Sequence, residues 1–233
     1  MSAPPRVPRG PDELAALVAQ LERRFRTTTS TLTVAGHAIA LLHPENAEDL
    51  IDERAFEEDE RLPYWADVWP SARILCGVVT ALRGRGRTFL ELGCGAGLVA
   101  TAAALAGFEV CATDYYDEAL LFTRANVWRH AGRPPRTRLV DWRQLPRDLG
   151  RFDVVAGSDV LYEREYGALV ASAVDRTLAP RGQVIIADPG RLAAADFLQQ
   201  MEARGIHLAA HERLPFAEDR VRQTINVYTL RRV

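Results

Sequence analysis

Three glycines alternate with small residues in the segment Glu91-Leu92-Gly93-Cys94-Gly95-Ala96-Gly97. Glycine has no Cβ, so such a loop can turn sharply and let its backbone approach a bound molecule closely. The apolar run Thr88 to Leu92 predicts a buried strand before the loop, and Leu98 to Ala106 predicts a helix after it. The first turn of that helix offers free N–H groups, so the spacing predicts a ligand-binding loop.

Such a loop could bind NAD, FAD, a phosphate or S-adenosylmethionine. Two further residues, Leu98 and Asp114, narrow this choice of ligand. A dinucleotide fingerprint places its third glycine at position 98, where this chain has Leu98. Asp114 ends the next predicted strand, and a carboxylate there can accept hydrogen bonds from both hydroxyls of a ribose. The competing interpretation makes Asp114 the N-cap of the next helix. We favour the ribose role because Asp114 occurs together with the glycine loop.

The elements that would position these residues alternate between strand and helix. This order predicts an open, mostly parallel sheet covered on both faces, with ligands bound outside the carboxyl ends of the strands. No helix separates the last two strands, which therefore pair antiparallel. After the loop helix, the predicted strands are Phe108–Thr113, Thr137–Val140, Phe152–Gly157, Gln183–Ala187, Ile206–Glu212 and Arg222–Leu230, and the predicted helices are Glu118–His130, Glu165–Leu178 and Arg191–Ala203.

The N-terminal part has a different pattern. Residues Asp12 to Arg26 have helical spacing, and Thr29–Val34 and His37–Leu42 predict a β-hairpin. The run Glu45 to Glu60 carries nine carboxylates and one arginine. A further helix is predicted from Ser71 to Leu82, with Pro70 at its start. We expect residues 1–62 to form an extension, beginning with a disordered tail at 1–10, and residues 63–233 to form the main domain.

The glycine segment resembles motif I of the class I methyltransferases, which use S-adenosylmethionine and release S-adenosylhomocysteine. The resemblance extends from Thr88 to about Leu230. It implies a Rossmann-like α/β sheet of seven strands, mostly parallel with the last strand antiparallel, and helices on both faces. It also implies that Gly93, Gly95 and Gly97 face the methionine part of the cofactor, that Asp114 holds the ribose, and that Glu91 supports the loop and contacts the cofactor through water.

The same resemblance places the adenine after the third strand, where Asp141-Trp142 stands. Asp141 could accept a hydrogen bond from the adenine amine. Trp142 could stack on the ring, a contact that contributes about 1–3 kcal/mol. The alternative role for Trp142 is to close the edge of the core.

A narrower resemblance joins two separated segments to methyltransferase family 16, which contains many protein-lysine methyltransferases. One is Ser158-Asp159-Val160-Leu161-Tyr162, and the other is Pro63-Tyr64-Trp65-Ala66-Asp67-Val68-Trp69-Pro70. Capping of the next helix by Asp159, packing of Tyr162, and core contacts of the two tryptophans are the competing interpretations. The resemblance implies catalytic roles for Asp159 and Tyr162, cofactor contacts for Trp69 and Ser158, and substrate contacts for Tyr64 and Trp65. Asp188 directly follows the predicted strand Gln183–Ala187 on the same edge of the sheet, so we expect it to contribute to the substrate-binding mouth.

Methyl transfer to a lysine demands an uncharged amine in line with the S–CH3 bond. The ordinary pKa of lysine is about 10.4, and burial among aromatic rings lowers it by desolvation. A carboxylate such as Asp159 would orient the amine but would also favour its charged form. We therefore assign Asp159 to binding and orientation rather than to proton abstraction.

Charge and cysteine content limit the partners. The formal net charge is −2. Arginines cluster before the first and third strands of the main domain, opposite the predicted site, which argues against a nucleic-acid substrate. The acidic run could attract a basic protein segment or could be a solvated helix face. The three cysteines match no metal-binding spacing and indicate a reducing, cytoplasmic setting.

The sequence therefore predicts a monomeric, cytoplasmic methyltransferase without metal or membrane association, acting on a lysine of a protein. A small-molecule N-methyltransferase resembling nicotinamide methyltransferases is the alternative. A non-catalytic binding protein with the same fold would carry a damaged cofactor loop, and this loop is intact.

Overall fold

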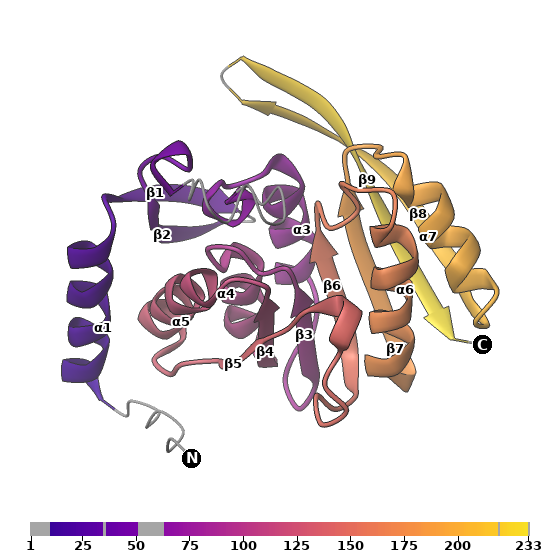
Figure 1. The fold of residues 1–233 in the computed structure, drawn as a ribbon, viewed down its shortest axis with the longest axis horizontal. Coiled ribbons are helices and arrows are strands. Elements are labelled where there is room, and N and C mark those ends of the chain that lie inside the picture. The colour runs from indigo at the N-terminus through magenta and orange to yellow at the C-terminus, as the bar shows by residue number, and fades with distance from the viewer. Residues whose placement is uncertain (1–9, 35, 51–62, 219, 233) are drawn as a thin grey trace.

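The computed structural model describes residues 10–34, 36–50, 63–218 and 220–232. Positions 1–9 of the predicted tail, 51–60 of the acidic run and the boundary expected before residue 63 fall in or beside the gaps. Figure 1 shows the elements in chain order: α1 Pro11–Arg24, β1 Thr27–Val34, β2 His37–Pro44, α3 Pro70–Thr80, β3 Thr88–Leu92, α4 Leu98–Leu105, β4 Glu109–Asp114, α5 Asp117–Ala131, β5 Arg136–Leu139, β6 Phe152–Ser158, α6 Tyr166–Thr177, β7 Leu178–Asp188, α7 Ala193–Glu202, β8 Ile206–Glu218 and β9 Val221–Arg232. Short 3-10 helices are η1 Glu48–Leu50, η2 Tyr64–Ala66 and η3 Trp142–Gln144.

Seven strands form one sheet in the order β5-β4-β3-β6-β7-β9-β8. The strands from β5 to β7 are parallel, and β9 runs antiparallel between β7 and β8. This confirms the predicted mostly parallel sheet with an antiparallel last strand. The chain leaves β3 toward β4 and returns to its other side as β6, so the strand order reverses at β3. Such a reversal opens a crevice at the carboxyl ends of the two strands.

Both faces of the sheet are covered. Phe89 points into a core shared with α3, α4 and α5, whereas its neighbour Leu90 points into a core shared with α6 and α7. Successive side chains on a strand point to opposite faces, and a parallel strand covered on both sides must be apolar at every position. The continuous apolar run from Phe89 to Leu92 meets that demand, apart from the buried Glu91.

The N-terminal helix and hairpin pack against α5. Leu17 and Leu21 of α1 and Leu42 of β2 contact Phe122 and its neighbours in a third apolar cluster. Asn126 of α5 is fully buried and binds the hairpin through both the N–H and the carbonyl of Leu42, at 2.8 and 2.7 Å. Its amide also donates to the Ala96 carbonyl at 2.8 Å, so one side chain joins the extension to the glycine loop.

The C-terminal hairpin is longer than predicted. Strand β8 continues to Glu218, and its outer half extends past the end of β7 (Figure 1). Leu214 and Phe216 lie against the core beside α3, and Glu218 pairs with Arg73 of that helix. These contacts with a helix far away in the sequence stabilise the outer residues of β8, which the local sequence pattern did not predict as strand. No helix in the described part of the chain is long and apolar enough to cross a membrane.

Candidate active site

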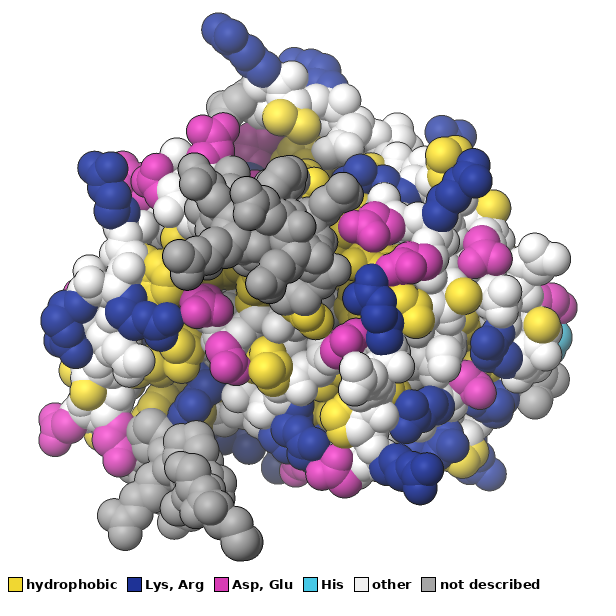
Figure 2. All heavy atoms as spheres, in the orientation of Figure 1, with side chains coloured by type: hydrophobic (Ala, Val, Ile, Leu, Met, Phe, Trp, Pro, Cys, Tyr) yellow, Lys and Arg dark blue, Asp and Glu magenta, His cyan; other side chains and the backbone are white. Residues whose placement is uncertain are grey.

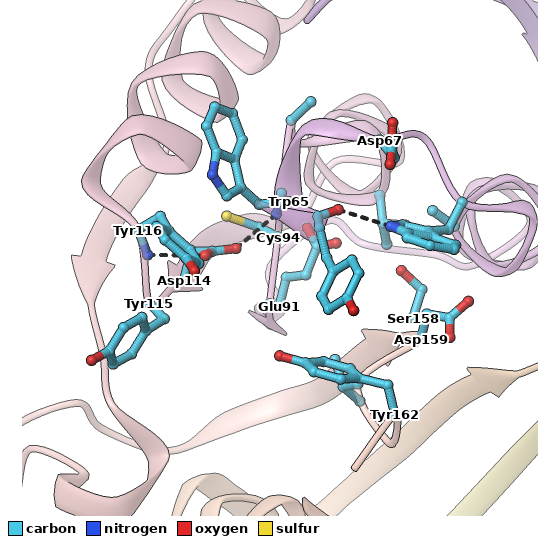
Figure 3. A pocket seen from close by; sticks show the side chains of 18 of the residues that line it. Trp65, Asp67, Glu91, Cys94, Asp114, Tyr115, Tyr116, Ser158, Asp159 and Tyr162 are labelled. Carbon is cyan, nitrogen blue, oxygen red and sulfur yellow. Dashed lines mark hydrogen bonds between the residues drawn. The ribbon is translucent and has the colours of Figure 1, made fainter. Parts of the chain in front are cut away.

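A cavity of about 450 Å³ opens at the carboxyl ends of β3, β4 and β6. Figure 3 shows Asp114, Tyr115 and Tyr116 on one side, Ser158 and Asp159 on the other, and Glu91 between them. The predicted site residues that line it are Tyr64, Trp65, Trp69, Glu91, Gly93, Gly95, Gly97, Asp114, Asp141, Trp142, Ser158, Asp159 and Tyr162. The predicted substrate residue Asp188 is not among the lining residues.

The glycine loop adopts a backbone that other residues would strain. Its three glycines have φ angles of +66°, +51° and +87°. A Cβ on Gly97 would lie 2.6 Å from Thr123 Oγ1 and 2.7 Å from Thr123 Cα, closer than atoms can approach. The Cys94 N–H donates to the Thr113 carbonyl at 2.9 Å, which ties the loop to β4. Only glycine fits where α4 begins against α5.

Asp114 holds the loop with one oxygen and the following turn with the other. Its Oδ2 accepts from the Gly95 N–H at 2.9 Å, and its Oδ1 accepts from the Tyr116 N–H at 3.1 Å. The N-cap residue of α5 is Tyr116, so Asp114 does not cap that helix. Burial raises the pKa of Asp114 to about 6, although the backbone donors oppose the shift. Each carboxylate oxygen keeps a second lone pair for a ligand.

Glu91 is a buried carboxyl group with unused hydrogen-bonding capacity. Its Oε2 is buried and has no hydrogen-bond partner among the described residues. Burial raises the pKa of Glu91 well above its ordinary value, and the nearby Asp114 acts in the same direction. A buried unpaired oxygen costs free energy, so the cavity floor is suited to a ligand that donates a hydrogen bond. The amine of S-adenosylmethionine is such a donor, and the loop and Asp114 also fit this cofactor.

Asp141 and Trp142 begin η3 at the far side of the cavity. The Asp141 Oδ1 accepts from the Arg143 N–H at 2.8 Å, which caps this short helix. The Trp142 ring stands edge-on to Tyr166, with ring centroids 5.6 Å apart. A Cβ on Gly93 would lie 3.7 Å from the Trp142 ring, so this ring borders the loop. Trp142 therefore packs on the core and lines the cavity at once.

Aromatic rings form the mouth of the cavity. Tyr64 and Tyr162 are 43% and 39% exposed, and their centroids lie 5.6 Å apart. Tyr162 also contacts Tyr166 at 4.7 Å, and Trp69 Nε1 donates to the Tyr64 carbonyl at 2.8 Å. Partial burial of the Tyr162 phenol, together with a hydrogen bond with Tyr166, raises its pKa, so the phenol stays protonated. Tyr162 can shape the mouth and donate a hydrogen bond, but it does not supply a base.

The structure also gives the surroundings of Trp65, Asp188 and Asp159, three of the predicted site residues. The Trp65 ring packs on Tyr116 and Phe122, the core contact that we weighed against a substrate role. Asp188 is fully buried, and its Oδ1 accepts from two backbone N–H groups of the loop after β7. Asp159 does not cap α6, which begins at Tyr166 with Glu165 as its N-cap residue.

Several lining residues were missed by the sequence analysis. Tyr115 and Tyr116 directly follow Asp114, so their position at the end of β4 was a signal that could have found them. Tyr166 was read as part of a helix, and nothing local marks it as a wall of the cavity. Arg191 belongs to the loop after β7 and also lines the cavity. The described residues hold no cluster of three or more side chains suited to a metal ion.

Comparisons with known proteins agree with this geometry. Residues 52–204 match the family model described as lysine methyltransferase. The chain is 31% identical over 165 residues to the EEF1A lysine methyltransferase 3 of Mus musculus, covering 66% of this chain and 68% of the relative. It is 30% identical over 157 residues to the electron transfer flavoprotein beta subunit lysine methyltransferase of Danio rerio, covering 66% of this chain and 59% of the relative.

A solved structure shares the fold. The magnesium protoporphyrin IX methyltransferase of Synechocystis PCC 6803, crystallised with bound S-adenosylmethionine, superposes with a TM-score of 0.57 at 20% identity. The match covers 79% of this chain and 94% of that protein. The family match includes the strands β3, β4 and β6, and the cavity opens at their carboxyl ends, the edge at which open α/β sheets bind ligands. The chain therefore belongs to the lysine methyltransferase family and is a methyltransferase that uses S-adenosylmethionine.

Proposed function

We propose that this protein methylates the side-chain amine of a lysine in a protein substrate. The observation that carries the proposal is the exposed pair Tyr64 and Tyr162, which leads from solvent to the cofactor cavity. The two rings are in edge-on contact, so a lysine side chain would lie along them rather than between them, and aromatic faces attract ammonium and methylammonium groups. The two relatives named above carry the lysine methyltransferase description, and both are named for protein substrates.

The cofactor would occupy the side of the cavity formed by β3, β4 and η3. Its bound form supplies a methyl group on a positively charged sulfur, which the amine lone pair takes as the C–S bond breaks. Glu91 and the glycine loop would hold the methionine part, Asp114 the ribose, and Asp141 with Trp142 the adenine. Trp69 and Ser158 would complete the wall beside the methyl group.

The chain itself contributes alignment rather than acid–base chemistry. The acceptor amine must lose its proton before transfer because an ammonium has no free lone pair, and Tyr162, which stays protonated, does not take up that proton. Tyr64 and Tyr162 would exclude water and hold the aliphatic part of the lysine in line with the methyl group. Alignment of this kind can account for a large part of a rate enhancement.

One labelling experiment tests the proposal. The protein is incubated with radiolabelled S-adenosylmethionine and a cell lysate, and labelled protein is hydrolysed to identify methylated lysine. The chain contains no lysine, so methyllysine in the hydrolysate cannot come from the enzyme itself. Label in protein that is recovered as methyllysine supports the proposal. Label confined to small molecules or RNA, or label on another amino acid, contradicts it.

We also propose that the protein acts in a reducing compartment such as the cytoplasm. Its three cysteines are buried and free, as expected where disulfides are rare.

A further inference from the structure

The loop after β7 is built to aim one side chain into the cavity. Gly190 has a left-handed backbone with φ +101°, which turns the chain sharply after Asp188. The Asp188 Oδ1 accepts from the N–H groups of Gly190 and Arg191, both at 2.7 Å. The Asp188 carbonyl accepts in turn from the side chain of Asn226 on β9. This buried carboxyl group therefore fixes the backbone from which the Arg191 side chain reaches the cavity wall.

Arg191 contacts the carboxylate that was assigned to the acceptor. Its Nε and Nη2 both donate to Asp159 Oδ1, at 3.1 and 2.9 Å. From α3, the Ser71 hydroxyl donates to Asp159 Oδ2 at 3.2 Å. Asp159 has a left-handed backbone with φ +56°, unusual for a residue other than glycine, and it reaches both partners from that conformation. The Asp159 side chain is 7% exposed and that of Arg191 is 38% exposed, so a cation already stands beside this carboxylate.

We propose that Arg191 is a positioning residue of the acceptor site, which orients Asp159 and cancels its charge so that the lysine binds as the free amine. The inference rests on the proposed function and adds to it. An isolated carboxylate beside the acceptor would favour the ammonium form, which has no lone pair for the methyl group. A guanidinium in contact with that carboxylate removes this preference, because the pair has no net charge.

Several other titratable groups lie around the pair. Burial raises the pKa of Asp67 before α3, of Glu91 on β3 and of Asp188 at the end of β7. Burial also raises the pKa of Tyr162, which keeps its proton. Glu163 at the mouth is exposed to solvent, where its charge is screened. Arg191 contacts Asp159 directly, so the charge of Asp159 is the one that Arg191 is placed to offset.

The transfer step itself balances without any further reactant. The nitrogen lone pair forms the new N–C bond, and the electrons of the broken S–C bond stay on sulfur, which becomes a neutral thioether. The nitrogen gains the positive charge and later releases one proton to solvent. A charge-neutral Asp159–Arg191 pair leaves the starting amine uncharged, which is the form that this step consumes.

The test is the pH dependence of kcat, since kcat reports the enzyme–substrate complex. The variants are Arg191→Met, Arg191→Lys, Asp159→Asn and the double variant Asp159→Asn/Arg191→Met. They are assayed on the purified protein that the wild type labels, at saturating cofactor. Arg191→Met leaves Asp159 unbalanced, so its curve should move to higher pH by about one unit or more and its rate near neutrality should fall about tenfold. Arg191→Lys keeps the charge and should keep the position of the curve.

The remaining variants separate charge from structure. Asp159→Asn leaves the arginine unbalanced and should move the curve to lower pH, while the double variant should return it toward the wild-type position even if its maximal rate is low. Affinity for S-adenosylhomocysteine, measured by calorimetry, checks that each variant is folded. If the wild type transfers no methyl group to lysine, the proposed function is wrong. If the wild type is active but Arg191→Met or Asp159→Asn lowers the rate equally at every pH, the role of Arg191 is overturned alone.

Discussion

The two ends of the sheet carry cavities of equal size and different chemistry. The cavity at the carboxyl ends and a second one at the amino ends each measure about 450 Å³. The second is lined by Arg133, Arg136 and Arg151 beside Phe108 and Phe152. In Figure 2 basic side chains gather along the lower edge of this face, where Figure 1 shows the amino ends of the strands.

Two of the three arginines that line the amino-end cavity are already engaged. Arg136 donates to the Leu149 carbonyl at 2.7 Å, and its guanidinium lies over the Phe152 ring. Arg151 donates to the Leu178 carbonyl at 2.6 Å. At the other end, Glu91 keeps an oxygen without a partner among the described residues. The comparison shows that unused hydrogen-bonding capacity, rather than volume, distinguishes a candidate ligand site from a gap between elements.

The strongest test of the difference between the two cavities is to add one methyl group beside each of them. Gly97→Ala and Gly150→Ala both place a side chain on a left-handed backbone, with φ +87° and +97°. At Gly97 the new Cβ would overlap Thr123, whereas at Gly150 nothing lies within 4 Å. We expect Gly97→Ala to abolish measurable cofactor binding and to lower the melting temperature strongly. Gly150→Ala should cost about 1–2 kcal/mol of stability and leave binding intact. Equal losses of binding in calorimetry would contradict this contrast.

A second comparison removes one carboxylate from each end. Asp114→Ala takes away the acceptor for Gly95 and the proposed ribose contact, so we expect cofactor affinity to fall by about 1–3 kcal/mol, or about tenfold to a hundredfold. Asp148→Ala removes the partner of Arg138 near the amino end. Isothermal calorimetry with S-adenosylhomocysteine should give the wild-type affinity for Asp148→Ala. An unchanged affinity in Asp114→Ala would show that the ribose is held elsewhere.

The pH dependence of cofactor binding is a further test of the role of Asp114. The pKa of Asp114 is raised from 3.8 to about 6, so this carboxyl group gains a proton as the pH falls through about 6. The protonated form is a poorer acceptor for ribose hydroxyls, so affinity should fall below that pH, by about tenfold over one unit. The stability of the cofactor-free protein should change in the opposite direction to the affinity as the pH falls. The folded state then binds a proton that the unfolded chain lacks, so this group adds stability between about pH 6 and pH 4 as the pH falls. Asp114→Asn should abolish both trends in binding and in urea unfolding.

The smallest functional effect should come from the second cavity. Arg136→Met removes the hydrogen bond to Leu149 and the contact with Phe152, so the free energy of unfolding should fall by about 1–2 kcal/mol. Methyl transfer and cofactor affinity should stay at wild-type values. A large loss of activity in a variant that remains folded would mean that the amino-end cavity takes part in function.

The sequence predicted most elements of the sheet because their signals are local. An apolar run such as Phe89–Leu92 has to be buried on both sides, which predicts a central strand. A glycine-rich segment between a predicted strand and a predicted helix is readily recognised as a loop. The order of these elements then predicts the topology and the edge at which the site lies. Asp114 and the glycine loop could be placed at that edge because each follows a strand directly.

The tertiary structure decided which of these residues act together. Asn126 joins the Leu42 backbone to Ala96, and Arg191 meets Asp159 from a different loop. The ring of Trp65 packs in the core while it also lines the cavity, Asp188 is not among the lining residues, and Tyr166 forms one of the walls. Each of these outcomes depends on contacts between segments far apart in the chain. Periodicity and spacing carry no information about such contacts, because they describe only the neighbours of a residue along the sequence.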